Sequence, residues 1–518
     1  MIKMGIFRWV PLFCLNQEIP RPAIMPIETE DDRGRQNPED QPETSSFWGQ
    51  ARNLPWPFWV ANIMETIERL AYYGVRVVIP VYIAQADEIG GLHFSQGDKG
   101  FIFLWWALVQ SSLPVISGGF ADHYGYKKQI VVAVFLKGLG YLLMASQRTF
   151  WPFFAGCLLL AAGTAVFKPP IQGTFVKALT AKTSGVGWGL FYMVINVGAF
   201  LGPPLAHFLY GYSWPMVFYG CALLVTLNLL WLFTYQEVNP GVANNGGVWQ
   251  VLAETLREIL NPRLLAFILI ISVFWAVFEQ LWDMLPNFIV DWVDSYSLAQ
   301  HLPWFMLSRN LTRGPQIAQE WVINLNPLLI ILMVAPLSWY VNRVMRRLSS
   351  IFFGFIFVTL GIYLVGASMS IYLCLGGIVC FSFGEMMCSP KMREYLGVIA
   401  PADKKALYMG YTSIPYAFGW GYGTYLGGQL YERFGEKAGL ALRYMSQVLK
   451  VHELPDRAHA FAALTGMLGQ TPAEVTRLLW DKYDPGWVWT PFAIAGIFSS
   501  LAMFVFIRVA RRWRDVNV

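Results

Sequence analysis

Charged residues are scarce in this sequence. Only 14% of its 518 residues are Asp, Glu, Lys or Arg, whereas 55% are hydrophobic. Soluble globular domains carry charge at about a quarter of their positions, so a single soluble domain is excluded. The net charge is only +5, and the basic residues form no patch interleaved with aromatic side chains. This pattern excludes a nucleic-acid partner.

Cysteine motifs and enzyme signatures are also missing. The six cysteines lie mostly in apolar segments and show neither a C-x-x-C pair nor a Cys/His metal spacing. We interpret them as packing residues and expect no disulfide, no metal ion and no cofactor. The sequence contains no G-x-S-x-G, H-E-x-x-H or G-x-x-x-x-G-K-[ST] motif. An enzyme is therefore disfavoured.

Long apolar segments are abundant instead. A membrane-spanning helix needs about 20 apolar residues, and the 37 Phe, 22 Trp, 24 Tyr and 46 Gly are typical of packed membrane helices. The pattern predicts an all-α membrane protein with twelve transmembrane helices in two six-helix bundles. The expected spans lie near 57–84, 99–120, 129–146, 151–174, 186–210, 214–235, 264–291, 319–341, 350–370, 372–397, 405–430 and 487–508.

Polar segments divide the chain. Lys and Arg are concentrated in alternate loops, which places both termini in the cytoplasm, while the sparse outer loops hold Lys99 and few other cations. Met25 is an alternative start. The expected organisation is a disordered cytoplasmic tail (1–55), a first bundle (56–235), a linker with an amphipathic helix (236–263), a second bundle (264–510) with an outer helical insert (431–486), and a cytoplasmic tail (511–518).

The first span carries four charges at membrane depth. Each would cost about 2.5–3.5 kcal/mol if it faced lipid near mid-membrane, so these side chains must face protein or water. At helical spacing they share one face with two phenols. A structural stripe, with Glu65 paired to Arg69, is the alternative to a solute pathway. The residues of this face are Glu65, Glu68, Arg69, Tyr72, Tyr73 and Arg76.

Later spans contribute further ionisable groups. Lys168 precedes a Pro-Pro pair, which we expect to interrupt its helix beside a cavity; Lys168 could instead reach the membrane surface. Glu279 and Asp283 lie one helical turn apart, so one of them is expected to hold a proton. Glu394 lies three residues after Lys391, and an ion pair with it is the alternative to a place in the site.

Several motifs resemble those of a known family. GGFADHYGYKK (118–128) resembles the signature loop of the major facilitator superfamily, with Gly119, Asp122, Gly125, Lys127 and Lys128 as expected gating residues. ETIERLAYYG resembles the E-x-x-E-R-F-x-Y-Y motif of the proton-dependent oligopeptide transporters within it. The segments FYMVINVGAF, FWAVFEQ, GTAVFKPP, LNPLL and GEMMCSPKMREY are similar to further elements of that family, in the same order.

The resemblance implies roles for individual residues. Proton coupling would involve Glu65, Glu68, Arg69, Lys168 and Glu279, with Lys168 paired to the first-span motif. Arg76, Tyr73 and Lys168 would receive the carboxylate of a peptide, and Glu279, Asn326 and Glu394 its amino group. The full expected binding set is Tyr72, Tyr73, Arg76, Lys168, Asn196, Trp275, Glu279, Asn326 and Glu394.

The implied function is import of di- and tripeptides together with protons, by alternating access, in the bilayer of the cell membrane and as a monomer. The chain departs from the family at Asp283, Lys391 and Arg393, where charges replace neutral residues. The alternative is therefore a transporter of the same superfamily for another small solute, such as an amino-acid conjugate, nitrate or a drug-like compound.

Overall fold

Long helices dominate the computed structural model, which describes residues 51–180, 183–238, 260–310, 312–399 and 411–513. Contacts divide the chain into residues 1–46 and 47–518, and the description below concerns the second unit. Most of the expected tail (1–55) and most of the expected linker (236–263) lie outside the described residues.

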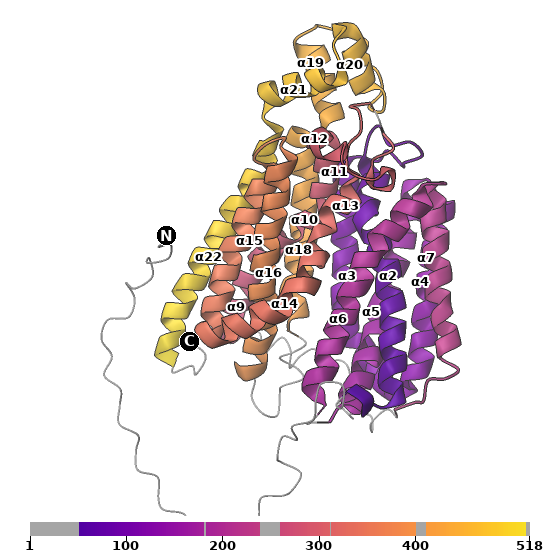
Figure 1. Ribbon diagram of the computed structural model, residues 1–518, viewed down its shortest axis with the longest axis vertical. Helices are drawn as coiled ribbons and strands as arrows, with labels where there is room; N and C mark the ends of the chain where they lie inside the picture. Colours follow the sequence, from indigo (N-terminus) through magenta and orange to yellow (C-terminus); the bar gives the residue numbers. More distant parts are fainter. Residues whose placement is uncertain (1–50, 181–182, 239–259, 311, 400–410, 514–518) are drawn as a thin grey trace, which may run out of the picture. The chain divides into compact units, whose positions relative to one another are not determined.

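Six helices pack together in the first half of the chain, and Figure 1 shows them in indigo to magenta. Helix α2 packs against α5, α6 and α7, and α4 packs against α5 and α7. Their buried side chains form one apolar core. The six are α2 (Trp56–Ala84), α3 (Gln96–Tyr124), α4 (Tyr126–Ser146), α5 (Phe150–Ala178), α6 (Ser184–Tyr210) and α7 (Trp214–Trp231).

The second half forms a second bundle around its own core. Two of its six spans are broken: the first into α9 (Pro262–Phe278), α10 (Gln280–Asp283) and α11 (Leu285–Asp291), and the second into α13 (Gln319–Ile323) and α14 (Leu325–Val344). The other four are α15 (Arg347–Gly366), α16 (Ile371–Ile399), α18 (Ser413–Leu430) and α22 (Thr490–Ala510). Each of the twelve expected segments is thus mainly helical in its described residues.

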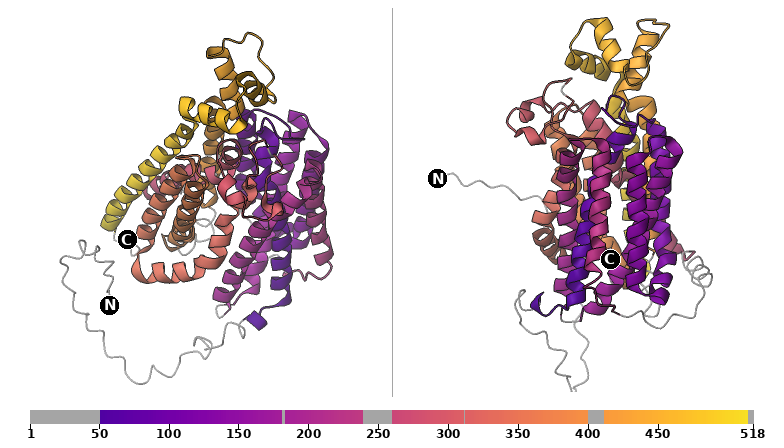
Figure 2. Two further views of the ribbon diagram at one scale, coloured as in Figure 1. Left: turned by 45° about the horizontal axis from the view of Figure 1, so that its top comes forward. Right: turned by 90° about the vertical axis from the view of Figure 1, so that its right-hand side faces the viewer.

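Three short helices stand between α18 and α22 at one end of the bundles (Figures 1 and 2). A π-helical turn, η4 (Tyr431–Gly435), leads from α18 into α19 (Lys437–Gln447), α20 (Ala460–Leu468) and α21 (Pro472–Tyr483), and η5 (Pro485–Trp489) leads into α22. We name the end of the bundles that carries α19–α21 the insert end. The opposite end, where α2 begins and α22 ends, is the terminal end.

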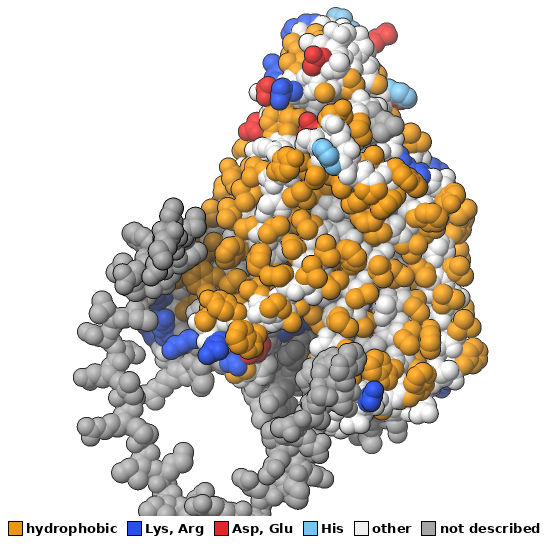
Figure 3. Space-filling view, in the orientation of Figure 1, with side chains coloured by type: hydrophobic (Ala, Val, Ile, Leu, Met, Phe, Trp, Pro, Cys, Tyr) orange, Lys and Arg blue, Asp and Glu red, His pale blue; other side chains and the backbone are white. Residues whose placement is uncertain are grey.

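The flanks of the bundles are apolar. In Figure 3 hydrophobic side chains cover the helical region, while charged side chains gather toward the two ends. Exposed apolar residues include Leu223, Phe233 and Trp339, with exposed fractions of 66%, 84% and 65%. Nine helical segments of the described residues are long and apolar enough to cross a membrane. The three other spans are α2, which carries the buried charges, and α3 and α18, which pack together between the bundles.

Glycines allow the closest helix contacts. A Cβ on Gly377 of α16 would lie 2.8 Å from the carbonyl oxygen of Gly361 on α15, and a Cβ on Gly202 of α6 would lie 2.6 Å from the backbone nitrogen of Gly74 on α2. Membrane helices lack a hydrophobic driving force for association, so close backbone packing of this kind holds the bundles together.

The Pro-Pro pair does not interrupt its helix as expected. Helix α5 runs through Pro169 and Pro170, although each proline removes the hydrogen bond to the carbonyl four residues earlier. Neighbouring helices supply the missing donors: Ser117 Oγ donates to the carbonyl oxygen of Ala165 (3.3 Å), and Gln129 Nε2 donates to that of Val166 (3.0 Å). The freed carbonyls are satisfied by protein rather than by a wet cavity.

Gln129 is therefore predicted to be important for stability. Gln129→Leu should lower the free energy of unfolding by about 1–3 kcal/mol, because it leaves the Val166 carbonyl without a donor. Thermal unfolding in detergent measures this effect. Gln147→Leu, at the end of the same helix, should change stability by less than about 0.5 kcal/mol; equal losses for both variants would contradict the assignment.

Candidate functional site

The charged face of α2 forms two separate clusters. The first, which we name the α2–α4 cluster, consists of Glu65, Glu68 and Arg69 of α2 and Lys137 of α4. Arg69 Nε lies 3.2 Å from Glu65 Oε1, and Arg69 also pairs with Glu68. Lys137 pairs with the other oxygen of Glu68. All four side chains are nearly inaccessible to solvent. This cluster lies wholly within the first bundle.

Lys137 was missed by the sequence analysis. It lies in an apolar segment, where a single lysine gives no sign of its partner, and it takes the place that the resemblance assigned to Lys168. Lys168 is within electrostatic range of Glu65, Glu68 and Arg69, but it forms no ion pair among the described residues. The expected pairing of Lys168 with the first-span motif is thus corrected.

The second cluster joins the two bundles, and we name it the inter-bundle cluster: Arg76 of α2, Lys99 of α3, and Glu279 and Asp283 beside and within α10. Arg76 pairs with Asp283, and its Nη2 lies 3.5 Å from Glu279 Oε2. The guanidinium also lies between the rings of Phe103 and Trp420, 5.0 and 5.2 Å from their centroids.

Asp283 is held from several sides. Thr424 and Trp420 of α18 both donate to its carboxylate, the latter at 3.0 Å. Only 4% of Glu279 and 1% of Asp283 is exposed. The break between α9 and α10 places Glu279 at the junction, so the two carboxylates approach Arg76 together. The cluster thus brings two basic and two acidic side chains together in a buried site, where an unpaired charge is strongly unfavourable.

Lys99 corrects a further expectation. The sequence analysis placed it in an outer loop, but only 1% of it is exposed. Its ammonium donates to the Asp283 carbonyl oxygen (3.0 Å) and to Asn287 Oδ1 (2.8 Å). A capping box between Ser95 and Asp98 begins α3 just before it, so Lys99 belongs to the first turn of a spanning helix. In the sequence, a lysine at the edge of an apolar segment cannot be told apart from a loop residue.

A third polar group lies in the second bundle. Asn326 Nδ2 donates to Glu385 Oε2 (2.8 Å) and to Ser382 Oγ (3.0 Å). Glu385 is within electrostatic range of Tyr73 and Tyr192 of the first bundle and of Glu279. It therefore faces the space between the bundles.

Glu394 lies apart from these groups. It pairs with Arg347 and with Lys391 Nζ (2.5 Å), and its side chain is 37% exposed. It is nine residues beyond Glu385 on the continuous helix α16, so the two carboxylates point in different directions. The alternative of an ion pair with Lys391 is the one observed, and Glu394 does not join the candidate binding set in this conformation.

Among the remaining expected binding residues, Tyr73 lies at the boundary between the bundles, and the others contact residues of their own bundle. The rings of Tyr73 and Trp282 lie 6.2 Å apart across this boundary. Tyr72 accepts a hydrogen bond from Gln110 (3.1 Å), and Trp275 packs edge-on against Tyr416 at 4.9 Å. Asn196 donates to the Tyr192 carbonyl on its own helix.

The expected gating loop is partly described. Gly125, with φ of +93°, turns the chain between α3 and α4, and Glu237 accepts hydrogen bonds from the backbone nitrogens of Tyr126 (2.6 Å) and Lys127 (3.3 Å). A carboxylate at a helix N-terminus is favourable. Lys127 and Lys128 lie in the first turn of α4, and the surroundings of Gly119 and the side chain of Asp122 are not among what the structure describes.

A small cavity of about 40 Å³ lies between the bundles near the insert end. Trp214 Nε1 donates to Glu88 (3.0 Å), Arg309 donates to the Tyr210 carbonyl (2.7 Å), and His207 contacts Glu320. Burial raises the pKa of Glu88, in the loop between α2 and α3, to about 7. The sequence analysis did not identify this cavity, because its lining comes from helix ends and short loops far apart in the chain.

Comparison with known proteins identifies the class. The model of the Major Facilitator Superfamily matches residues 62–437, and the chain belongs to this family. It is a multi-pass membrane transporter with twelve transmembrane helices in two six-helix bundles. The expected fold is confirmed. Members of this family are transport proteins rather than enzymes.

The relatives and solved structures that resemble this chain bear names that refer to different substrates. Multidrug resistance protein MdtH of Edwardsiella ictaluri is 24% identical over 365 residues, covering 70% of this chain and 80% of the relative. MdtH of Proteus mirabilis is 23% identical over 388 residues, covering 74% and 88%. A peptide transporter POT in complex with sulfate has a TM-score of 0.63 at 17% identity, covering 90% of this chain and 99% of that one.

The fold alone does not select a substrate. The nucleoside transporter NupG fits about as well as the peptide transporter, with a TM-score of 0.62 at 12% identity, covering 87% of this chain and 99% of that chain. Substrate must therefore be argued from the residues between the bundles.

The α2–α4 cluster makes a stability prediction. Lys137→Met should destabilise the protein by about 3–5 kcal/mol, because it leaves Glu68 with less compensating charge in a buried site. Adding Glu68→Gln should restore most of the loss, which thermal unfolding of the two variants would measure. Lys128→Met, an exposed position on the same helix, is the matched control. No recovery in the double variant would contradict the pairing.

Proposed function

We propose that this protein is a proton-coupled symporter that imports small peptides by alternating access. The insert end is assigned to the outside, and both termini to the cytoplasm of a cell whose plasma or inner membrane holds the chain. The observation that carries the proposal is the buried pairing of Arg76 with Glu279 and Asp283 across the two bundles.

This pairing supplies a means of coupling. The bundles can part at the insert end only if Arg76 leaves the carboxylates, and separating buried opposite charges is unfavourable by several kcal/mol. A proton that neutralises Glu279 weakens the attraction and lowers this barrier. Each unit of pH gradient supplies about 1.4 kcal/mol per proton, and each 100 mV about 2.3 kcal/mol, which suffices to drive accumulation.

Charges between the bundles suit a zwitterion. Lys168 provides positive charge on the first bundle, and Glu385, held by Asn326, provides negative charge on the second. A peptide presents one fixed charge of each sign, so these groups would read its termini and leave its side chains loosely recognised. Glu385 takes the role that the resemblance gave to Glu394, because Glu394 is engaged by Arg347 and Lys391.

The resemblance to the proton-dependent oligopeptide transporters supports the proposal. The matching motifs supply most of the buried charges discussed above, including Glu65, Glu68, Arg69 and Glu279. Solved structures of similar fold include a POT family transporter in complex with 5-aminolevulinic acid, with a TM-score of 0.64 at 15% identity. Such a ligand carries an amino group and a carboxylate, as a peptide does.

Glu279 provides the first functional test. Glu279→Gln should abolish uptake driven by a proton gradient but spare exchange of substrate across the membrane. Glutamine has nearly the same shape as glutamate, but its side chain cannot bind and release a proton. Proteoliposomes with and without an imposed gradient measure both activities. Glu394→Gln is the comparison and should keep gradient-driven uptake. Full accumulation by the Glu279→Gln variant would refute the assigned role.

Drug-like compounds form the second candidate class of substrate, favoured by the names of the MdtH relatives. Substrate-dependent proton movement in proteoliposomes, with a panel of di- and tripeptides and a panel of lipophilic cations, separates the two. We expect dialanine to move protons and to compete with the other peptides. Proton movement with the cations alone would overturn the peptide assignment and favour the alternative.

A further inference from the structure

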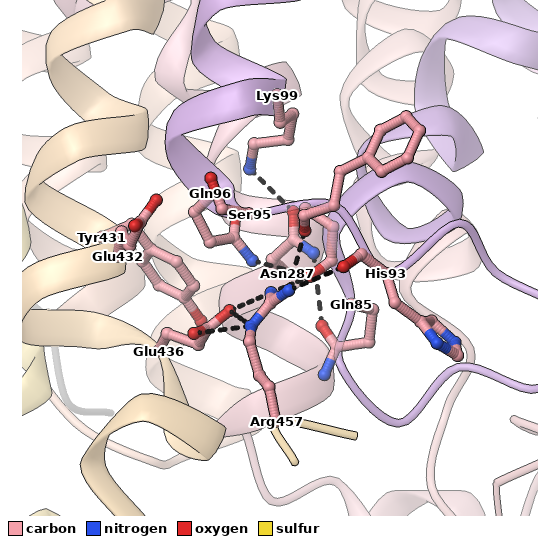
Figure 4. Close-up of polar contacts among 12 residues, drawn as sticks. Gln85, His93, Ser95, Gln96, Lys99, Asn287, Tyr431, Glu432, Glu436 and Arg457 are labelled. Carbon is pink, nitrogen blue, oxygen red and sulfur yellow. Dashed lines mark hydrogen bonds and ion pairs between the residues drawn. The ribbon is translucent and has the colours of Figure 1, made fainter. Parts of the chain in front are cut away.

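The insert has no task in the mechanism so far, yet it contacts both bundles. We propose that it is a latch that holds the insert end closed, with Arg457 as its positioning residue. Figure 4 shows Arg457 between Glu436, which precedes α19 in the insert, and the segment around His93 of the first bundle. This inference rests on the alternating access proposed above and is independent of the substrate.

Arg457 lies between α19 and α20 and is bonded on two sides. Its Nε donates to both carboxylate oxygens of Glu436, each at 3.0 Å, and that contact lies within the second bundle and its insert. Its two terminal nitrogens reach the first bundle: they donate to the carbonyl oxygens of Ala84 (2.6 Å), Phe94 (2.8 Å) and His93 (3.0 Å). The planar guanidinium serves all these acceptors at once.

The helix ends of the first bundle suit this contact. Ala84 is the last residue of α2, where unpaired carbonyls carry partial negative charge, and a cation there is favourable. A second contact uses the opposite sign: Glu432 of η4 accepts a hydrogen bond from Gly97, in the first turn of α3 (2.6 Å). Both ends of the α2–α3 connection are therefore held by a side chain of complementary charge. Arg457 contacts the C-terminal end of α2, and Glu432 contacts the N-terminal end of α3.

These contacts belong to a closed insert end. Other bonds between the bundles lie nearby: Gln85 donates to Asp291 (2.8 Å), and Asn287 donates to Gln85 (3.2 Å). When the bundles part at this end, the bonds from Arg457 to the first bundle and from Glu432 to Gly97 must break, whereas the pairing of Arg457 with Glu436 persists. Arg457 therefore favours the closed state without being needed to hold the second bundle together.

Val77 offers a reporter for the state of this end. It lies on α2, is 1% exposed, and packs with the core of the second bundle; unlike Ala86, it does not line the small cavity beside Arg457. A cysteine at position 77 should thus be reachable from the insert side only when the bundles separate. The rate of its reaction with a membrane-impermeant maleimide, added from that side, measures the open population. The chain with its native cysteines alone gives the background.

We expect Arg457→Ala in the Val77→Cys chain to raise the labelling rate about tenfold, which corresponds to about 1.4 kcal/mol. Arg457→Lys keeps the positive charge but lacks the planar guanidinium with its several N–H donors, so it should give an intermediate rate. Glu432→Gln should also raise the rate. Arg443→Ala is the matched control: Arg443 lies on α19 and donates to the Arg433 carbonyl (2.7 Å) within the second bundle. Its labelling rate should equal that of the parent.

Two results would overturn the latch. One is an unchanged rate in Arg457→Ala; the other is an equal rise in Arg443→Ala, which would indicate general loosening of the insert. Unchanged thermal unfolding of Arg457→Ala, alongside faster labelling, would support the latch over a folding defect. No substrate is present in the assay, so a wrong substrate assignment would leave these rates unaffected.

Discussion

The pairing of Arg76 with Glu279 and Asp283 is the interaction on which the arrangement of the two bundles depends. It brings one fixed cation from the first bundle against two carboxylates of the second in a site that excludes water. Hydrogen bonds from α18, and the Lys99 ammonium at the Asp283 carbonyl, hold the acidic side in place. A buried charge without a partner is strongly unfavourable, and in the proposed mechanism a proton on Glu279 weakens this pairing.

The α2–α4 cluster is different in kind. Its ion pairs lie between helices of one bundle, and they survive a rigid movement of the bundles past each other. We interpret this cluster as the fixed support of the charged face of α2. Lys137 compensates the charge of Glu68, so Lys168 is not needed as the partner of Glu68. The same face of α2 thus carries two kinds of ion pair. Those near Glu65 stay intact, and those of Arg76 must break and re-form when the bundles move.

Much of the fold was predictable because it follows from composition and periodicity. Apolar segments of spanning length gave the helices, and the i, i+4 spacing gave the pair of Glu65 and Arg69, which is observed at 3.2 Å. The breaks around α10 were not foreseen: Gln280–Asp283 contains no glycine or proline, and only the second break has a proline nearby, Pro286. The continuity of α5 through Pro169 and Pro170 depends on donors from α3 and α4, which only the tertiary structure brings near.

The site was predictable in its residue types and less so in its pairings. Lys99 and Lys137 each meet partners far away in sequence, and a lone lysine gives no sign of them. For Glu394 the sequence left open a place in the site or an ion pair with Lys391; the second Glu394 partner, Arg347, is one whose proximity no spacing reveals.

The central claim is that protonation between the bundles releases the insert end. Spin labels at positions 89 and 487, both exposed there on opposite bundles, report the separation directly by electron-electron distance measurement. The account predicts that acidification adds a population with a longer distance. A distance distribution that stays the same from alkaline to mildly acidic conditions would contradict it.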